Sequence, residues 1–223
     1  MANRSHHCVV HRPTRHEFRA MPGAFRIMLV EDHPVVRLGV KTVIDAQPDM
    51  EVVGEAETAA DAVLLATRIV PDVVILALRL EGRLCGVEVC RELKNLPHAP
   101  VVLIYTSFNT SEDVASSFLS GADGFVYKGA ESGRLLTSVR STCTGKRVWV
   151  ADATTHEHTS RLRRAVEESG LTPREREVLG FMLQHYTNSQ IAKELYIELS
   201  TVKTHVSNIL RKLDLSSRHQ LFT

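Results

Sequence analysis

Arg26–Pro34 has the sequence RIMLVEDHP, and within these few residues one pattern gives way to another. Four apolar residues follow Arg26, as expected for a strand that is buried on both faces. Glu31 and Asp32 come next, and Pro34 stands where the first turn of a helix would begin, a position that suits proline. A strand that ends in carboxylates and leads into a helix is typical of one unit of a parallel α/β sheet.

The same alternation of short apolar runs with helical stretches continues outward from this segment, and its last helix is predicted over Glu131–Thr144. The strands are predicted at Arg26–Val30, Met50–Ala56, Val73–Leu76, Val101–Tyr105 and Gly124–Tyr127. Strands that alternate with helices form βαβ units. We therefore expect an α/β domain built on a five-stranded, doubly wound parallel sheet with the flavodoxin-like strand order.

The composition of the 223-residue chain is that of a globular protein, with 43% hydrophobic and 24% charged residues. It excludes a mostly disordered, collagen-like or disulfide-scaffold chain. The apolar runs are all shorter than the ~20 residues that a membrane helix needs, so we expect no membrane partner. The four cysteines form no C-x-x-C pair and no zinc-ligand spacing, which favours reduced thiols in a cytoplasmic protein.

Charge and pattern divide the chain into four segments. Residues 1–25 are polar, with 4 basic residues and 1 acidic residue, and we expect a disordered extension there. Residues 26–148, the predicted α/β domain, hold 13 basic and 16 acidic residues. Residues 149–170 are polar and mixed in charge, which predicts a linker with a helical turn at most. Residues 171–223 hold 7 basic and 5 acidic residues and are helical in pattern throughout, so they form a second domain.

Three helix starts are predicted after residue 170. Capping boxes occur at Thr172–Glu175 and Thr187–Gln190, and Ser200 is predicted to cap the third helix. One face of that helix is apolar, and the other carries small hydrogen-bonding and basic side chains: Thr201, Lys203, Thr204, Ser207, Asn208 and Arg211. Such a face suits the major groove of DNA. With the tight connection before it, the pattern predicts a small all-α helix-turn-helix domain.

Polar side chains also follow several predicted strands, where the functional groups of a doubly wound sheet collect. Glu31 and Asp32 follow the first strand, Thr106 the fourth and Lys128 the fifth. Carboxylates can hold Mg²⁺, and an ammonium and a hydroxyl can hold phosphate oxygens. The sequence thus predicts a site for Mg²⁺ and a phosphoryl group. The structural alternative is a solvated acidic turn in which Asp32 caps the next helix.

These residues resemble the receiver domain of two-component response regulators, and the resemblance covers roughly residues 26–145. It implies Mg²⁺ binding by Glu31 and Asp32, a switch relayed by Thr106 and Phe125, and a contact between Lys128 and the phosphoryl group. It also implies an acceptor aspartate at the end of the third strand, followed by a loop in which proline is common. The acceptor position is Ala77, and the loop at residues 81–86 contains no proline.

A methyl group at position 77 can neither attack phosphorus nor bind Mg²⁺. Asp72 cannot replace the acceptor, because it lies at the far end of the strand, about 16 Å away in an extended chain. We therefore expect no phosphorylation at the usual place, weakened Mg²⁺ binding, and a Lys128 that pairs with Asp32 instead of a phosphate. Two explanations of Ala77 stay open: a naturally degenerate receiver, or a laboratory Asp→Ala change that locks an ordinary phosphorelay regulator in its unphosphorylated state.

Leu171–Leu213 resembles the LuxR-type DNA-binding domain of the NarL/FixJ class of response regulators. The resemblance assigns contacts with DNA to three groups of side chains. They are base contacts from Lys203, Thr204 and Ser207, phosphate contacts from Thr201, His205 and Arg211, and backbone contacts through a helix N-terminus from Ser189 and Gln190. Ser216–Thr223 corresponds to the start of a fourth helix, which in the family pairs two DNA-binding domains.

Together these features predict a cytoplasmic, sequence-specific transcriptional regulator. Its expected partners are double-stranded DNA, a second copy of the chain on that DNA, and a sensor kinase or other regulatory protein. The second hypothesis is a receiver that acts mainly as a protein-interaction module, with residual DNA binding. We expect no enzymatic activity, because a Mg²⁺-dependent phosphohydrolase built on Glu31 and Asp32 would lack its nucleophile as well.

Overall fold

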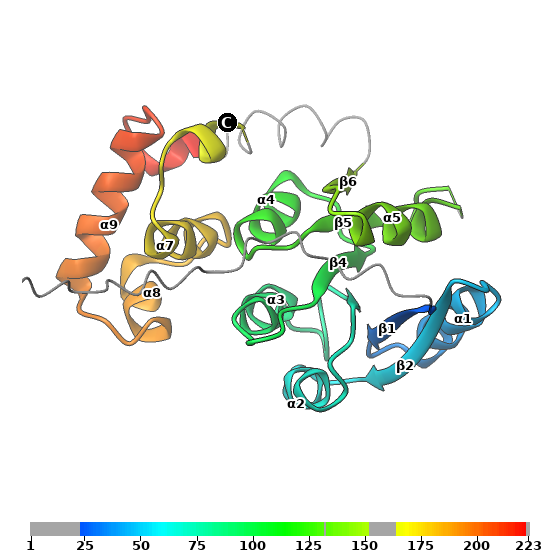
Figure 1. Cartoon of the computed structure of the whole chain (residues 1–223). Helices are drawn as coiled ribbons and strands as arrows, with labels where there is room; N and C mark the ends of the chain where they lie inside the picture. The colour runs from blue at the N-terminus through cyan, green and yellow to red at the C-terminus, as the bar shows by residue number, and fades with distance from the viewer. Residues whose placement is uncertain (1–22, 132, 152–163, 222–223) are drawn as a thin grey trace, which may run out of the picture.

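The computed structural model describes residues 23–131, 133–151 and 164–221. It contains an α/β part built on one parallel sheet and a smaller helical part, which lie at the right and left of Figure 1. Most of the predicted amino-terminal extension, residues 1–22, lies outside the described residues. Among the helices that the structure describes, none has the length and apolar character needed to cross a membrane.

The sheet has six parallel strands in the order β2-β1-β3-β4-β5-β6. The strands are β1 (Phe25–Val30), β2 (Met50–Ala56), β3 (Val73–Leu76), β4 (Val101–Thr106), β5 (Gly124–Tyr127) and β6 (Val148–Val150). The parallel sheet and the flavodoxin-like order of the first five strands confirm the predicted fold class. The predicted number of five strands is wrong, because β6 pairs with β5 along Gly124–Val126 and extends the sheet by one strand.

Helices cover both faces of the sheet (Figure 1). They are α1 (Pro34–Asp45), α2 (Ala59–Ile69), α3 (Gly86–Lys94), α4 (Ser111–Leu119) and α5 (Arg134–Cys143). Ile27 and Leu29 of β1 join the apolar cluster under α1 and α5, whereas Met28 and Val30 join the cluster under α2 and α3. Because both faces are covered, the successive residues Ile27–Val30 of β1 are all apolar and buried.

Strand β3 lies in the middle of the sheet, between β1 and β4, and all its residues are buried. Ala77 follows it directly, and its N–H donates a hydrogen bond to the carbonyl of Val30 at 2.9 Å. Ala77 is therefore held beside the carboxyl end of β1. As the sequence predicts, Asp72 lies at the opposite end of β3. There its N–H donates a hydrogen bond to the carbonyl of Arg26.

The helical part contains α7 (Pro173–Leu183), α8 (Asn188–Glu194), α9 (Leu199–Lys212) and the short 3₁₀ helix η1 (Arg218–Leu221). Both predicted capping boxes are confirmed: Thr172 with Glu175 begins α7, and Thr187 with Gln190 begins α8. Before α7, residues 164–168 form the predicted helical turn of the linker. In contrast, Trp149 of the predicted linker lies in strand β6.

The predicted cap at Ser200 is wrong. Helix α9 begins at Leu199 with Glu198 as its N-cap residue, so Ser200 lies inside the first turn. The preceding turn explains the shift, because the N–H of Ile197 donates to the carbonyl of Ala192 at 3.0 Å and Tyr196 takes a left-handed conformation with a φ of 51°. This closure of α8 fixes where the chain turns into α9.

The two parts of the molecule pack together through α4 and α7. Phe118 of α4 shares an apolar cluster with Val178, Phe181 and Met182 of α7. At the border of this cluster, the Arg91 guanidinium of α3 lies 5.3 Å from the centre of the Phe181 ring. Helix α9 packs on α7 from the other side, away from α4 (Figure 1).

Candidate functional site

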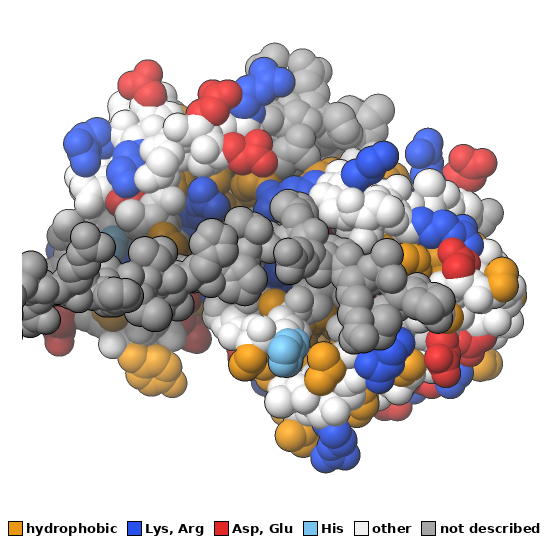
Figure 2. All heavy atoms as spheres, viewed as in Figure 1, with side chains coloured by type: hydrophobic (Ala, Val, Ile, Leu, Met, Phe, Trp, Pro, Cys, Tyr) orange, Lys and Arg blue, Asp and Glu red, His pale blue; other side chains and the backbone are white. Residues whose placement is uncertain are grey.

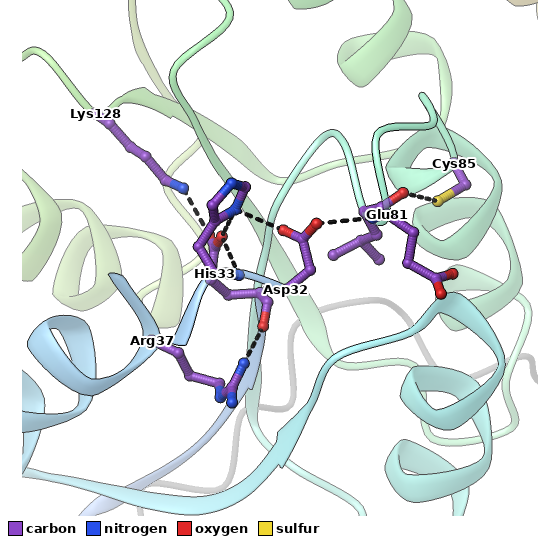
Figure 3. Close-up of polar contacts among 8 residues, drawn as sticks. Asp32, His33, Arg37, Glu81, Cys85 and Lys128 are labelled. Carbon is purple, nitrogen blue, oxygen red and sulfur yellow. Dashed lines mark hydrogen bonds and ion pairs between the residues drawn. The ribbon is translucent and has the colours of Figure 1, made fainter. Parts of the chain in front are cut away.

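The carboxyl edge of the sheet brings Lys128 together with the acidic pair Glu31 and Asp32, as the sequence predicts (Figure 3). Lys128, which follows β5, places its Nζ 2.6 Å from Glu31 Oε2. The side chains of both residues are largely buried, with 17% of Lys128 and 8% of Glu31 exposed. The predicted pairing of Lys128 with Asp32 is therefore wrong, because Glu31 continues the β1–β2 pairing through its N–H and the carbonyl of Ala56 and so faces the interior.

Asp32 instead points toward the loop after β3 (Figure 3). Its Oδ2 accepts a hydrogen bond from the backbone N–H of Glu81 at 2.8 Å. A proline at position 81 would have no N–H to donate, so the absence of proline from this loop makes the contact possible. Burial opposes the ionisation of Asp32, but the Glu81 N–H and His33 outweigh it and hold the carboxyl pKa below its usual value.

His33 bridges the two carboxylates. Its Nδ1 lies 3.0 Å from Glu31 Oε1 and 2.8 Å from Asp32 Oδ1. The hydrogen bond with Glu31 and the charge of Asp32 raise the pKa of this imidazole. A second cation, Arg37, donates to the backbone carbonyl of Glu31 at 2.6 Å. The acidic pair is thus surrounded by basic side chains of the protein itself, His33, Arg37 and Lys128, of which the sequence predicts only Lys128.

These residues do not fit the Mg²⁺ that receivers imply. Mg²⁺ takes octahedral oxygen ligands at short distances. Position 77 contributes a buried methyl group instead of a carboxylate. Three of the four carboxylate oxygens already have hydrogen-bonding partners: Glu31 Oε1 with His33, Glu31 Oε2 with Lys128, and Asp32 Oδ2 with the Glu81 N–H, whereas Asp32 Oδ1 has none. A metal ion would have to displace these contacts and would gain only two carboxylates.

The predicted switch residues are held inside the α/β part. Thr106 is buried, and its Oγ1 accepts a hydrogen bond from the N–H of Phe108 at 3.1 Å. Phe125 is fully buried and stacks on Trp149 of β6, with ring centres 6.4 Å apart. Trp149 in turn meets Phe118 of α4 edge-on, with ring centres 5.6 Å apart. The sequence places Trp149 in a linker, so this aromatic cluster was not predicted.

Helix α9 presents the predicted DNA-reading side chains on its outer face. Thr201, Lys203, Thr204, Ser207 and Arg211 are exposed, as are Ser189 and Gln190 of α8, whereas His205 and Asn208 are half-buried. On the opposite side, Val202 and Ile209 are fully buried in the core of the helical part. The sequence prediction thus divides α9 correctly into an outer polar face and an inner apolar one.

Contacts that the sequence does not reveal hold α9 and η1 against α7 and the residues next to it. Lys212 Nζ lies 2.7 Å from Glu175 Oε2 and 3.1 Å from the carbonyl of Gly170. Burial opposes the ionisation of Glu175, but hydrogen bonds from Lys212 and Thr172 outweigh it and lower the carboxyl pKa to about 2. Arg218 of η1 donates to the carbonyls of Met182 and Tyr186, at 2.9 and 2.6 Å. The sequence assigns Glu175 only a role in capping α7.

Comparison with known proteins assigns families to both parts. Residues 27–140 match the response regulator receiver domain, and residues 169–223 match the bacterial regulatory proteins of the luxR family. The chain is 36% identical to the transcriptional regulatory protein LiaR of Bacillus subtilis over 203 residues, which cover 87% of this chain and 93% of LiaR. It is also 36% identical to the nitrate/nitrite response regulator protein NarL of Escherichia coli K12, over 86% of this chain and 90% of NarL.

Solved structures agree with these families. A LuxR-family two-component response regulator from Aurantimonas sp. SI85-9A1 superposes with a TM-score of 0.57 at 31% identity, over 64% of this chain and 99% of that one. The response regulator ChrA of a heme-sensing two-component system superposes with a TM-score of 0.50 at 32% identity, over 89% of this chain and 94% of that one. The second match covers both parts of the molecule.

Proposed function

Because the chain belongs to the NarL class of response regulators, with a receiver domain and a LuxR-type DNA-binding domain, we propose that it regulates transcription without phosphorylation of its receiver. One observation carries this proposal: the polar face of α9 is exposed while the receiver is docked on α7. In response regulators whose receiver covers the DNA-reading helix, phosphorylation serves to release it. Here α9 needs no such release.

The methyl group of Ala77 supports the same conclusion, since the receiver has no nucleophile where an acceptor would lie. Control then comes from a partner protein, a ligand or the amount of protein made, and a sensor kinase has no acceptor at this position. For the same reason we propose no enzymatic role. The alternative explanation of Ala77 is a laboratory change of an acceptor aspartate. The Ala77→Asp variant, which restores that aspartate, is therefore the matched comparison for the present chain.

We propose that α9 lies in the major groove of double-stranded DNA, which has room for one helix. Lys203, Thr204 and Ser207 then contact base edges. The phosphate backbone is contacted by a larger set, which consists of Thr201, His205 and Arg211 of α9 and Ser189 and Gln190 at the start of α8. Asn208 lies within hydrogen-bonding distance of Arg211, 3.4 Å from Oδ1 to the guanidinium, and orients it.

The small positive charge of residues 171–223, with 7 basic and 5 acidic residues, favours binding as a dimer. Few phosphate contacts give weak affinity for a single copy, and two copies on half-sites about 34 Å apart add their contacts.

We propose a receiver domain of residues 26–150, two residues longer than the sequence predicts because β6 belongs to the sheet, followed by a linker to residue 170. DNA as a partner also favours a cytoplasmic location.

A gel shift over genomic fragments tests this function. We expect the purified, unmodified chain to prefer at least one fragment over random duplex at ~150 mM salt, where non-specific binding is weak. If every fragment binds as weakly as random duplex, the regulator proposal fails and the protein-interaction module becomes the better hypothesis.

A further inference from the structure

The carboxyl edge of the receiver carries a feature that its lost acceptor does not explain. The side chain of Glu31 is only 8% exposed, and an isolated buried carboxylate would be strongly unfavourable. A receiver solves this problem with a divalent cation, which does not fit the residues present here. Some other positive charge must balance Glu31.

Lys128 supplies that charge. Its Nζ lies 2.6 Å from Glu31 Oε2, within the range of a charge-assisted hydrogen bond. The backbone of Lys128 is fixed as well, because its N–H donates to the carbonyl of Thr106 at 2.7 Å and extends the β4–β5 pairing. The ammonium also lies 5.4 Å from the centre of the Tyr105 ring, where the face of the aromatic ring favours a cation. The chain therefore fixes the Lys128 backbone and holds its ammonium against Glu31 and the Tyr105 ring.

The second carboxylate is held through one of its oxygens. Asp32 Oδ2 accepts the Glu81 N–H at 2.8 Å, while Oδ1 lies 2.8 Å from His33 Nδ1 and has no hydrogen-bond partner among the described residues. The loop that donates this N–H is the one in which proline is common among receivers. Ala77 and this loop without proline thus act together: the first removes a metal ligand, and the second places an N–H on a carboxylate oxygen that would otherwise be available to a metal.

We infer that the Lys128 ammonium is the resident cation of this site, so that the receiver binds no divalent metal there. The inference rests on the proposed phosphorylation-independent function and deepens it, because it states how the acidic pair is kept stable without Mg²⁺. Lys128 has changed its task from contacting a phosphoryl group to neutralising Glu31.

Titration of the full-length protein with MgCl₂ and MnCl₂ by calorimetry tests the inference directly. We expect no binding heat and no shift in Tm at ~10 mM metal, since a metal that does not bind the folded state cannot stabilise it. Ionic strength is matched with NaCl. The unfolding transition is followed by the fluorescence of Trp149, the single tryptophan, which contacts both Phe118 and Phe125.

Lys128→Met sharpens the test, because it removes the charge and keeps the apolar stem. The variant should melt at a lower temperature than the wild type, and ~10 mM Mg²⁺ should restore part of the loss, because Glu31 is then left as a buried carboxylate without its cation. Lys94→Met is the matched control, since Lys94 Nζ lies 2.7 Å from Asp123 Oδ2 and its side chain is 16% exposed, but it lies away from the acidic pair. Its melting temperature should fall without recovery in Mg²⁺.

Saturable binding of Mg²⁺ or Mn²⁺ to the wild type at up to ~10 mM metal, with a matching rise in Tm, would overturn the inference, and this readout needs no variant. Equal responses of Lys128→Met and Lys94→Met to Mg²⁺ would also overturn it, because Lys128 would then be an ordinary structural ion pair. These readouts involve no DNA. Failure of the proposed function is seen separately, as the loss of fragment preference in the gel shift.

Discussion

Lys128 and Lys203 carry the same charge in two regions that use it in opposite ways. Lys128 ends inside the receiver against Glu31, whereas Lys203 is exposed on the outer face of α9. Around Lys128, the groups that would respond to phosphorylation are engaged with one another. Around Lys203, hydrogen-bonding side chains face outward along one side of a helix. The two lysines thus differ in surroundings: one is fixed in an ion pair inside the receiver, and the other is exposed on the helix that we propose binds DNA.

The largest effect on stability is expected at Phe125, inside the receiver. As a switch residue it would change position at little cost, but as a core residue stacked on Trp149 it is fully buried. We predict that Phe125→Ala lowers the free energy of unfolding by about 3–5 kcal/mol, the usual cost of truncating a buried aromatic residue. Urea denaturation followed by circular dichroism measures it. A loss below ~1 kcal/mol would contradict this role in the core and favour Phe125 as a mobile switch residue.

The second largest effect on stability is expected at the inward-facing basic residue of α9. Lys212 faces inward against Glu175, whose carboxyl pKa lies at about 2 instead of its ordinary value of 4.5. A lowered folded-state pKa contributes stability above the unfolded pKa, and this contribution is lost as the pH falls from about 5 toward 2. We predict that Glu175→Gln costs about 2–3 kcal/mol at pH 7 and little near pH 2.

Denaturant unfolding at several pH values measures this difference between Glu175→Gln and the wild type. The control is Glu177→Gln, on the same helix, where the side chain is 23% exposed and pairs with Arg174. Glu177 is only half-buried, and partly solvated ion pairs contribute less than buried ones, so the control should change the stability by about 1 kcal/mol or less at either pH. Parallel pH curves for Glu175→Gln and the wild type would show that the pair with Lys212 does not stabilise the helical part.

A smaller effect is expected on the outer face. Lys203→Ala should leave the stability within ~0.5 kcal/mol of the wild type, because the side chain is exposed. It should weaken binding to the preferred DNA fragment by about 1–3 kcal/mol if Lys203 contacts a base edge. Fluorescence anisotropy with labelled duplex measures the affinity. Lys146→Ala, an exposed lysine of the receiver, is the matched control, and an equal loss in both variants would place Lys203 on a merely solvated face.

Much of the fold follows from the sequence because its strands are short, apolar and regularly spaced. Val73–Leu76 is predicted at the observed bounds, since Pro71 and Asp72 precede a run in which every residue is buried. Strand β6 is not predicted because Val148–Val150 is too short to show a periodicity. It forms a strand only through its pairing with β5. Ser200 fails as a cap because the closure of α8 at Tyr196 decides where α9 begins.

The candidate site shows the same limit at the level of side chains. Ala77 is visible in the sequence, because a residue type alone decides that no oxygen is present. The partner of Lys128 is not, because the choice between Glu31 and Asp32 depends on which of them continues the β1–β2 pairing. The contact of Asp32 with the Glu81 N–H joins residues 49 positions apart, and only the folded chain brings them together.

Phosphorylation-independent DNA binding is tested by the affinity of the wild-type chain for its preferred fragment. The affinity is measured with and without acetyl phosphate and Mg²⁺, beside the Ala77→Asp variant. We predict that the wild type binds equally well in both conditions and takes up no phosphoryl label. A clear rise in wild-type affinity with acetyl phosphate, together with Mg²⁺-dependent labelling of the receiver, would contradict it.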